Sequence, residues 1–174
     1  MPAVPSHVVP STRIAVITRG RVELVDITER VAGTLEGSGL ADGTVHLWCP
    51  HTSCGLAVTE DEEGLHEDLA TVFEELAPTA RGWVHDDLTR RWQNVVPGER
   101  PNGDSHIRAV LATTPSLCIP LHADALALGR WQRLFLVELD GPRERTVTVQ
   151  CWGIASSVGS ASGPDTDSEA RSRS

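Results

Sequence analysis

Long apolar runs and a recognisable leader are both missing from this sequence. No uninterrupted apolar stretch approaches the roughly 20 residues that a membrane-spanning helix needs. The first twelve residues hold three prolines and lack the basic segment followed by an apolar one that marks a signal peptide. We therefore expect neither a secretory signal nor a membrane partner, and the sequence shows no internal repeat.

Positive charge and cysteine are also scarce. Fifteen Lys and Arg residues stand against 24 Asp and Glu residues, which gives a net charge of −9. A field of this sign does not attract nucleic acid or anionic lipid, so we expect no nucleic-acid partner. The four cysteines show no CxxC spacing and do not indicate a disulfide scaffold. We therefore predict reduced thiols and a cytoplasmic protein.

The composition that remains is that of one small globular domain. The chain has 174 residues, of which 40% are hydrophobic and 22% charged. Its last residues, SSVGSASGPDTDSEARSRS, are almost all small or polar, and such a segment cannot bury enough surface to offset its ordering entropy. We predict an irregular segment over 1–12, one folded domain over 13–154 and a disordered tail over 155–174.

The pattern of apolar residues predicts an α+β fold. Two strands, 13–18 and 22–27, are expected to be joined by a tight turn, and a short helix is expected within 24–37. Further strands are predicted at 44–49, 117–121, 133–139 and 146–151. Because the strands do not alternate regularly with helices, a parallel βα fold is not indicated.

Two longer helices are predicted in the middle of the chain. Residues 62–77 place five apolar side chains on one helical face, with Thr59 and Glu62 as a capping box: Leu65, Leu69, Val72, Phe73 and Leu76. Residues 105–113 begin at an N-cap, Asp104 or Ser105, and carry an expected buried stripe: Ile107, Val110 and Leu111.

Three histidines stand at element boundaries with polar neighbours. His51 follows a strand end in CPHTSCG, His85 lies in WVHDDL, and His106 lies in NGDSHIR, in the first turn of a helix. Three imidazoles with an open position form a common catalytic metal set, and a helix N-terminus favours a bound anion. Neighbouring carboxylates could complete or orient such a site: Asp86, Asp87 and Asp104. The alternative is that these are capping and surface histidines.

Other reactive side chains have plainer interpretations. His46, inside a strand, is expected to be packed, and His66 is expected to be a solvated helix residue. Cys54 could be a metal ligand or an activated thiolate, although a small packed residue is the more common role. Five arginines either bind a phosphorylated substrate or simply solvate the surface: Arg81, Arg90, Arg91, Arg100 and Arg108.

An ordered set of motifs resembles the YjbQ family, also described as secondary thiamine-phosphate synthases. The matching segments are TRGRVELVDIT, CPHTSCGLAVTEDE, VHDD, DSHIRAVL and SLCIPLHADALALGRWQRLFLVELDGPRERTVTVQ, which contains the Gly-x-Trp-Gln signature at 129–132. One such motif would be weak evidence, but the set covers residues 13–150 in order.

The resemblance implies a fold, an assembly and an activity. The fold is a sandwich of mostly antiparallel strands with two to three helices, assembled as a homotrimer with the site near a subunit boundary. The activity joins a pyrimidine pyrophosphate to a thiazole phosphate. A divalent metal, zinc or magnesium, would bind His51, His85 and His106, which with Asp86 would be catalytic. The implied substrate-binding residues are Ser53, Arg130, Trp131, Gln132 and Glu138.

Several positions depart from the family pattern and leave the substrate open. Arg130 replaces a usual threonine, Ala125 replaces a turn glycine, and Leu88 and Thr89 follow the His-Asp step where an acidic residue and glycine are usual. An alanine at a positive φ costs roughly 1 kcal/mol, so the hairpin at Ala125 is expected to be of another type. The alternatives are a metal- or small-ligand-binding protein without catalysis, and a metal-assisted hydrolase at the same pocket.

Overall fold

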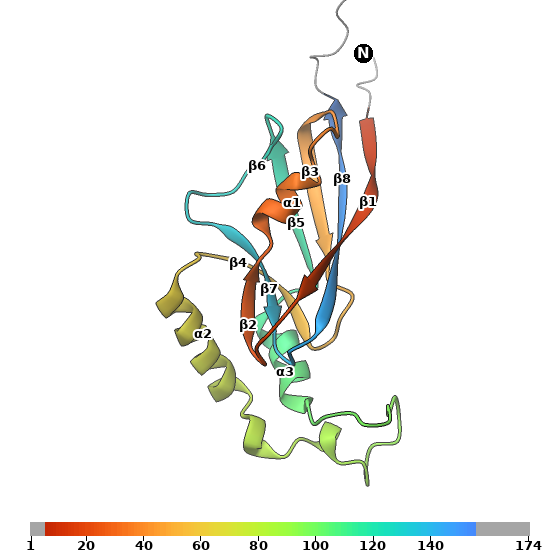
Figure 1. Cartoon of the computed structure of the whole chain (residues 1–174), viewed down its shortest axis with the longest axis vertical. Coiled ribbons are helices and arrows are strands. Elements are labelled where there is room, and N and C mark those ends of the chain that lie inside the picture. The colour runs from red at the N-terminus through yellow and green to blue at the C-terminus, as the bar shows by residue number, and fades with distance from the viewer. Residues whose placement is uncertain (1–5, 156–174) are drawn as a thin grey trace, which may run out of the picture.

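Two antiparallel sheets and a layer of helices make up the computed structural model, which describes residues 6–155 (Figure 1). The first sheet has five strands in the order β1 (Ser6–Ile17), β8 (Glu144–Ala155), β3 (Leu40–Trp48), β5 (Ser116–His122) and β6 (Ala125–Leu126). The second has three, in the order β2 (Glu23–Asp26), β7 (Arg133–Glu138) and β4 (Cys54–Thr59). The α+β fold of mostly antiparallel strands is therefore confirmed.

Three α-helices accompany the sheets within the described residues. They are α1 (Thr28–Gly33), α2 (Glu63–Leu76) and α3 (Gly103–Ala112), with 3₁₀ turns at Thr79–Arg81 and Val84–Asp86. None of the helices found in residues 6–155 has the length and apolar character needed to cross a membrane. Both long helices thus occur close to their predicted positions.

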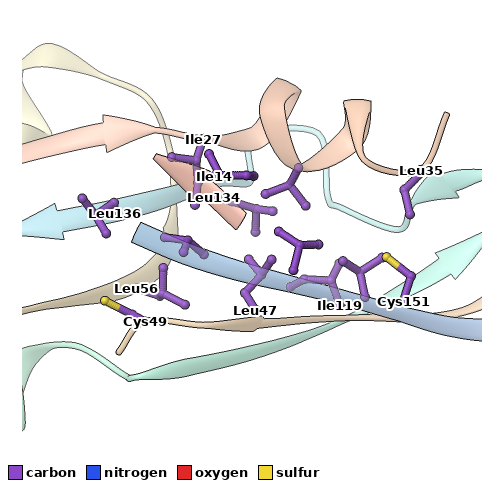
Figure 2. Close-up of a cluster of buried hydrophobic side chains, with 14 of the residues drawn as sticks. Ile14, Ile27, Leu35, Leu47, Cys49, Leu56, Ile119, Leu134, Leu136 and Cys151 are labelled. Carbon is purple, nitrogen blue, oxygen red and sulfur yellow. The ribbon is translucent and has the colours of Figure 1, made fainter. Parts of the chain in front are cut away.

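Strand β7 shows how the layers are held together. Its side chains alternate, so that Leu134 and Leu136 join the core between the two sheets, while Phe135 and Val137 join a second cluster with Phe73 of α2. Figure 2 shows the inter-sheet core, which extends from Cys49 and Leu56 to Cys151. The three-stranded sheet is apolar on both faces because it lies between the five-stranded sheet and helix α2.

The predicted hairpin between the first two strands is wrong. β1 pairs with β8, whereas β2 pairs with β7 in the other sheet, so residues 18–22 cross between sheets. β1 also begins at Ser6, so the irregular segment predicted over 1–12 is wrong from that residue onward. Pro10 is accommodated because it lies in a register shift of an edge strand. Ala155, the first residue of the predicted disordered tail, is instead the last residue of β8, and the remainder of that tail, 156–174, lies outside the described residues.

Two local predictions about caps and turns are also corrected. α2 is capped by Glu62, whose carboxylate accepts the Gly64 and Leu65 N–H groups at 2.8 and 2.7 Å, and not by Thr59. The β5–β6 turn has positive φ angles at Ala123 and Asp124, not at Ala125. Positive φ at both central residues is the geometry of a type I′ turn.

Helix α3 buries a different set of side chains from the one predicted. Ile107, Val110 and Leu111 are 37%, 79% and 63% exposed, so they do not form a buried stripe. Asp104 and Arg108 are each 1% exposed instead. The charged face is tolerated inside because Arg108 donates to the Ala77 carbonyl and to the carboxylate of Glu74. This arrangement leaves a row of apolar side chains on the surface.

Candidate functional site

His85 and His106 meet at one end of the helical layer. His85 lies in the 3₁₀ turn Val84–Asp86 and His106 in the first turn of α3, with their ring centroids 4.6 Å apart. His106 Nδ1 lies 2.9 Å from the Thr52 carbonyl oxygen, which as an acceptor fixes a proton on that nitrogen. His106 Nε2 is therefore the ring atom left to exchange a proton.

Asp86 holds the two histidine-bearing segments together. Its carboxylate accepts the backbone N–H groups of Asn102 and Gly103 at 2.9 and 3.0 Å, at the start of α3. The predicted N-caps, Asp104 and Ser105, are thus wrong, since the cap comes from the preceding turn. Gly103 is required here because a Cβ would lie 2.6 Å from the Trp83 Cβ. Asp86 therefore holds the turn that carries His85 against the start of the helix that carries His106.

A pocket of about 590 Å³ opens next to this histidine pair. Three arginines from two separate segments line it, together with His85 and His106: Arg91, Arg100 and Arg143. In a chain of net charge −9, this is a local concentration of guanidinium groups, the side chain that fits phosphate oxygens bidentately. Of the five arginines singled out in the sequence, only Arg91 and Arg100 lie here.

Each pocket arginine already has a partner of its own. Arg91 Nη1 donates to His85 Nε2 at 3.1 Å, and its Nη2 pairs with Glu99 at 2.7 Å. Arg100 donates to the Asp140 carbonyl at 3.0 Å, and Arg143 Nε donates to the Asp140 carboxylate at 3.0 Å. These bonds hold the arginines in place while leaving donors on the guanidinium groups of Arg100 and Arg143, which are half-exposed.

His51 does not join the other two histidines. Its Nε2 accepts the Thr146 N–H at 2.9 Å, and it lines a separate, mainly apolar hollow of about 310 Å³ with Cys54 and Val110. Burial and the nearby Arg145 guanidinium lower the pKa of His51, so its imidazole is neutral. Thr52 borders both hollows, which places His51 one residue away from the His85–His106 pocket.

Ser53 and Glu138 belong to a buried polar network behind the site. Glu138 is fully buried and binds Arg145 through both carboxylate oxygens, at 2.7 and 2.6 Å. Arg145 also donates to Ser53 Oγ at 3.0 Å. Burial alone would raise the pKa of Glu138, but the bonds from Arg145 and the Asp140 N–H hold it below its usual range. Neither residue lines the arginine pocket.

The Gly-x-Trp-Gln loop lies at the opposite end of β7 from the histidines (Figure 1). The Arg130 guanidinium lies 4.5 Å from the centroid of the exposed Trp131 ring. Gln132 Oε1 accepts the Gly129 N–H at 2.8 Å, which closes the turn. One chain therefore does not bring this loop to the pocket.

Two further histidines pack against aromatic rings. The His46 ring centroid lies 6.1 Å from that of Trp152, in keeping with a packed strand residue. His66 is half-buried with its ring edge-on to Phe135, the ring centroids lying 5.3 Å apart, so its predicted solvated role is wrong.

Sequence reasoning missed Arg143 and Asp140, which lie in a turn with no local signal of function.

Residues 12–154 match the protein family described as UPF0047 protein YjbQ-like. A UPF0047 protein of Archaeoglobus fulgidus is 38% identical over 133 residues, which cover 76% of this chain and 94% of that protein. A UPF0047 protein of Methanothermobacter thermautotrophicus is 35% identical over 136 residues, covering 78% and 87%.

Solved structures show the same architecture. A YbjQ-like protein of unknown function from Sulfolobus solfataricus P2 superposes with a TM-score of 0.75 at 33% identity, covering 86% of this chain and 99% of that one. A hypothetical protein from Aeropyrum pernix K1 gives a TM-score of 0.73 at 32% identity, covering 83% and 99%.

Proposed function

This chain belongs to the UPF0047 YjbQ-like family, and from that premise we propose that it is a transferase acting on small phosphorylated substrates. The proposed reaction is of the thiamine-phosphate-synthase type, joining a pyrimidine pyrophosphate to a thiazole phosphate. The observation that carries the proposal is the pocket in which Arg91, Arg100 and Arg143 surround His85 and His106. We place this activity in the cytoplasm, because all four cysteines are free thiols.

The chemistry of this reaction matches the groups in the pocket. As the thiazole phosphate forms its bond to the pyrimidine substrate, the bond between that substrate and its diphosphate oxygen breaks. Negative charge then grows on the leaving diphosphate. Guanidinium groups of Arg100 and Arg143 would stabilise that charge, since they fit phosphate oxygens bidentately. His106, as imidazolium, would donate its Nε2 proton to the departing diphosphate.

Zinc or magnesium at the three histidines is the cofactor implied by the resemblance. Within residues 6–155 of one chain, no three His, Cys, Asp or Glu side chains are grouped to hold a metal ion. The donors of one chain therefore do not fit a resident ion, and the roles proposed for Arg100, Arg143 and His106 do not require one. The cofactor stays a prediction for metal analysis of the purified protein: stoichiometric metal that is lost in His106→Gln supports it, and a metal-free, fully active protein contradicts it.

We also propose a homotrimer, supported by the exposed apolar row on α3. Val110 and Leu111 are 79% and 63% exposed, and burial of such side chains between subunits is favourable. Val110→Glu is expected to dissociate the assembly in analytical ultracentrifugation. Ile17→Glu, at a 75% exposed position of β1, is the control that should remain trimeric. A wild-type monomer at micromolar concentration would contradict the assembly.

The activity is tested by supplying both phosphorylated substrates, with and without added magnesium or zinc, and measuring thiamine phosphate and pyrophosphate. We expect His106→Gln to lose at least about 100-fold in rate while staying folded. His122→Gln is the matched control, because His122 is exposed and paired with Asp42 at 2.6 Å outside the pocket. Wild-type protein that forms no product under either condition would contradict the proposal.

A second candidate, a small-anion-binding protein without catalysis, is favoured by one contact. Arg91 donates to His85 Nε2, which occupies the lone pair that a general base would need. The same assay separates the candidates when pyrophosphate binding is measured by calorimetry. Binding without turnover supports this candidate, and turnover that is lost in His106→Gln excludes it.

A further inference from the structure

Two thiols face one another in the loop that carries His51. Cys49 follows the last residue of β3 and Cys54 is the first residue of β4, and their Sγ atoms lie 3.5 Å apart. Both side chains are buried, at 1% and 2% exposure. At this separation the two sulfur atoms are in van der Waals contact.

The pair borders a surface hollow on the side of Cys54. Cys54 forms part of the wall of the hollow of about 310 Å³ that also contains His51 and Val110. Cys49 belongs to the inter-sheet core and lies far along that core from Cys151 (Figure 2). A molecule as small as hydrogen peroxide can therefore approach Cys54 through the hollow.

Contact between two buried thiols favours a disulfide as the product of oxidation. A sulfenic acid formed on one sulfur lies directly beside the thiol that can resolve it, so a disulfide forms before the sulfur is oxidised further.

We propose that Cys49 and Cys54 form a redox modification site, closing to a reversible disulfide when the protein meets hydrogen peroxide. The Cys54 thiol, which borders the hollow, loses its proton as its sulfur attacks one peroxide oxygen; the O–O bond breaks, and the released hydroxide takes up a proton and leaves as water. The Cys49 sulfur then attacks the sulfenic sulfur and gives up its proton, and hydroxide leaves as a second water. In sum, two thiols and one peroxide give one disulfide and two waters.

The disulfide acts on the loop between the two cysteines. Forming it brings the sulfur atoms from 3.5 Å to about 2.05 Å and fixes both ends of a turn that includes His51 and Thr52. The Thr52 carbonyl accepts the proton of His106 Nδ1 at 2.9 Å, so this turn is connected to the His85–His106 pair. Oxidation is therefore expected to change the environment of the His106 ring.

Peptide mass analysis tests the proposal directly on the full chain. The sequence contains no lysine, so trypsin cuts only at arginine and releases both thiols in one peptide, residues 31–81, with Cys118 and Cys151 in two others. After peroxide treatment and alkylation, peptide 31–81 should lack two hydrogens and resist alkylation. Dithiothreitol should restore both thiols, and circular dichroism should show that the oxidised protein remains folded.

Variants separate this pair from the other cysteines. Cys118→Ser removes an exposed thiol and should leave disulfide formation unchanged, and Cys151→Ala, a buried control, should do the same. Cys54→Ala should abolish the loss of two hydrogens, and the oxidation-dependent shift of the His106 ring signal in NMR should disappear with it. Native protein whose peptide 31–81 stays fully alkylatable, or gains oxygen without forming a disulfide, would overturn the proposal, whatever the catalytic assay shows.

Discussion

Arg145 and Arg100 both approach the turn after β7, yet their side chains are 7% and 50% exposed. Arg145 gives its donors to Glu138 and Ser53 inside the protein. Arg100 makes one hydrogen bond, to the Asp140 carbonyl, has the Asp140 carboxylate 3.8 Å from its Nη2, and lines the pocket. The same guanidinium group is thus committed to the fold in one place and has donors to spare in the other.

This difference assigns separate roles to charged residues that look alike in the sequence. A buried charge left without its partner is strongly destabilising, so the Glu138–Arg145 pair is maintained by the cost of breaking it. An exposed guanidinium is little needed for stability and keeps its donors for a ligand. Burial, more than residue type, therefore separates the structural arginines from the candidate ligand-binding ones.

The largest effect is expected when the buried pair is broken. Arg145→Met leaves Glu138 charged and buried, and we expect it to lower the free energy of unfolding by about 3–5 kcal/mol in urea denaturation. Arg133→Met removes a half-exposed arginine that pairs with Asp26 and Glu29 on the surface, and it should cost less than about 1 kcal/mol. Equal losses of unfolding free energy in the two variants would contradict the difference between the buried and the exposed arginines.

A smaller effect is expected from acid. Burial would raise the pKa of Asp104, but bonds from Arg21 and Thr79 lower it, so the carboxylate stabilises the fold above its unfolded pKa of about 3.9. This stability is present at neutral pH and is lost as the pH falls through the lower folded value. We expect Asp104→Asn to cost on the order of 2 kcal/mol at pH 7 and to show a shallower loss between about pH 5 and 2. Parallel pH profiles would contradict the assignment.

The smallest effect on stability is expected in the pocket. Arg100→Gln should weaken pyrophosphate binding about tenfold in calorimetry, a loss of about 1.4 kcal/mol, while unfolding changes by less than about 0.5 kcal/mol. Arg90→Gln is the matched control, since Arg90 is an exposed arginine of the same loop that does not line the pocket. If both variants bind pyrophosphate as the wild type does, Arg100 has no part in ligand binding.

The structure brings together some of the residues predicted for the site and holds others apart from it. His85 and His106 line one pocket, and each stands at an element boundary, a feature that local sequence records. His51 and Ser53 are instead engaged by Thr146 and Arg145, which lie 95 and 92 residues further along the chain. Glu138 is engaged by Arg145 inside the protein and does not line the pocket. Arg143 had no signal, because its role depends on Asp140 and on the loop that closes the pocket.

By itself the sequence determined the class of fold, most strands and both long helices, because apolar periodicity reports the backbone geometry of residues two to four positions apart. Only the tertiary structure decided that β1 and β2 enter different sheets, that α3 turns its charged face inward, and that Cys49 meets Cys54. Those outcomes depend on which distant surfaces pack together, and periodicity shows that a face is apolar without showing what covers it.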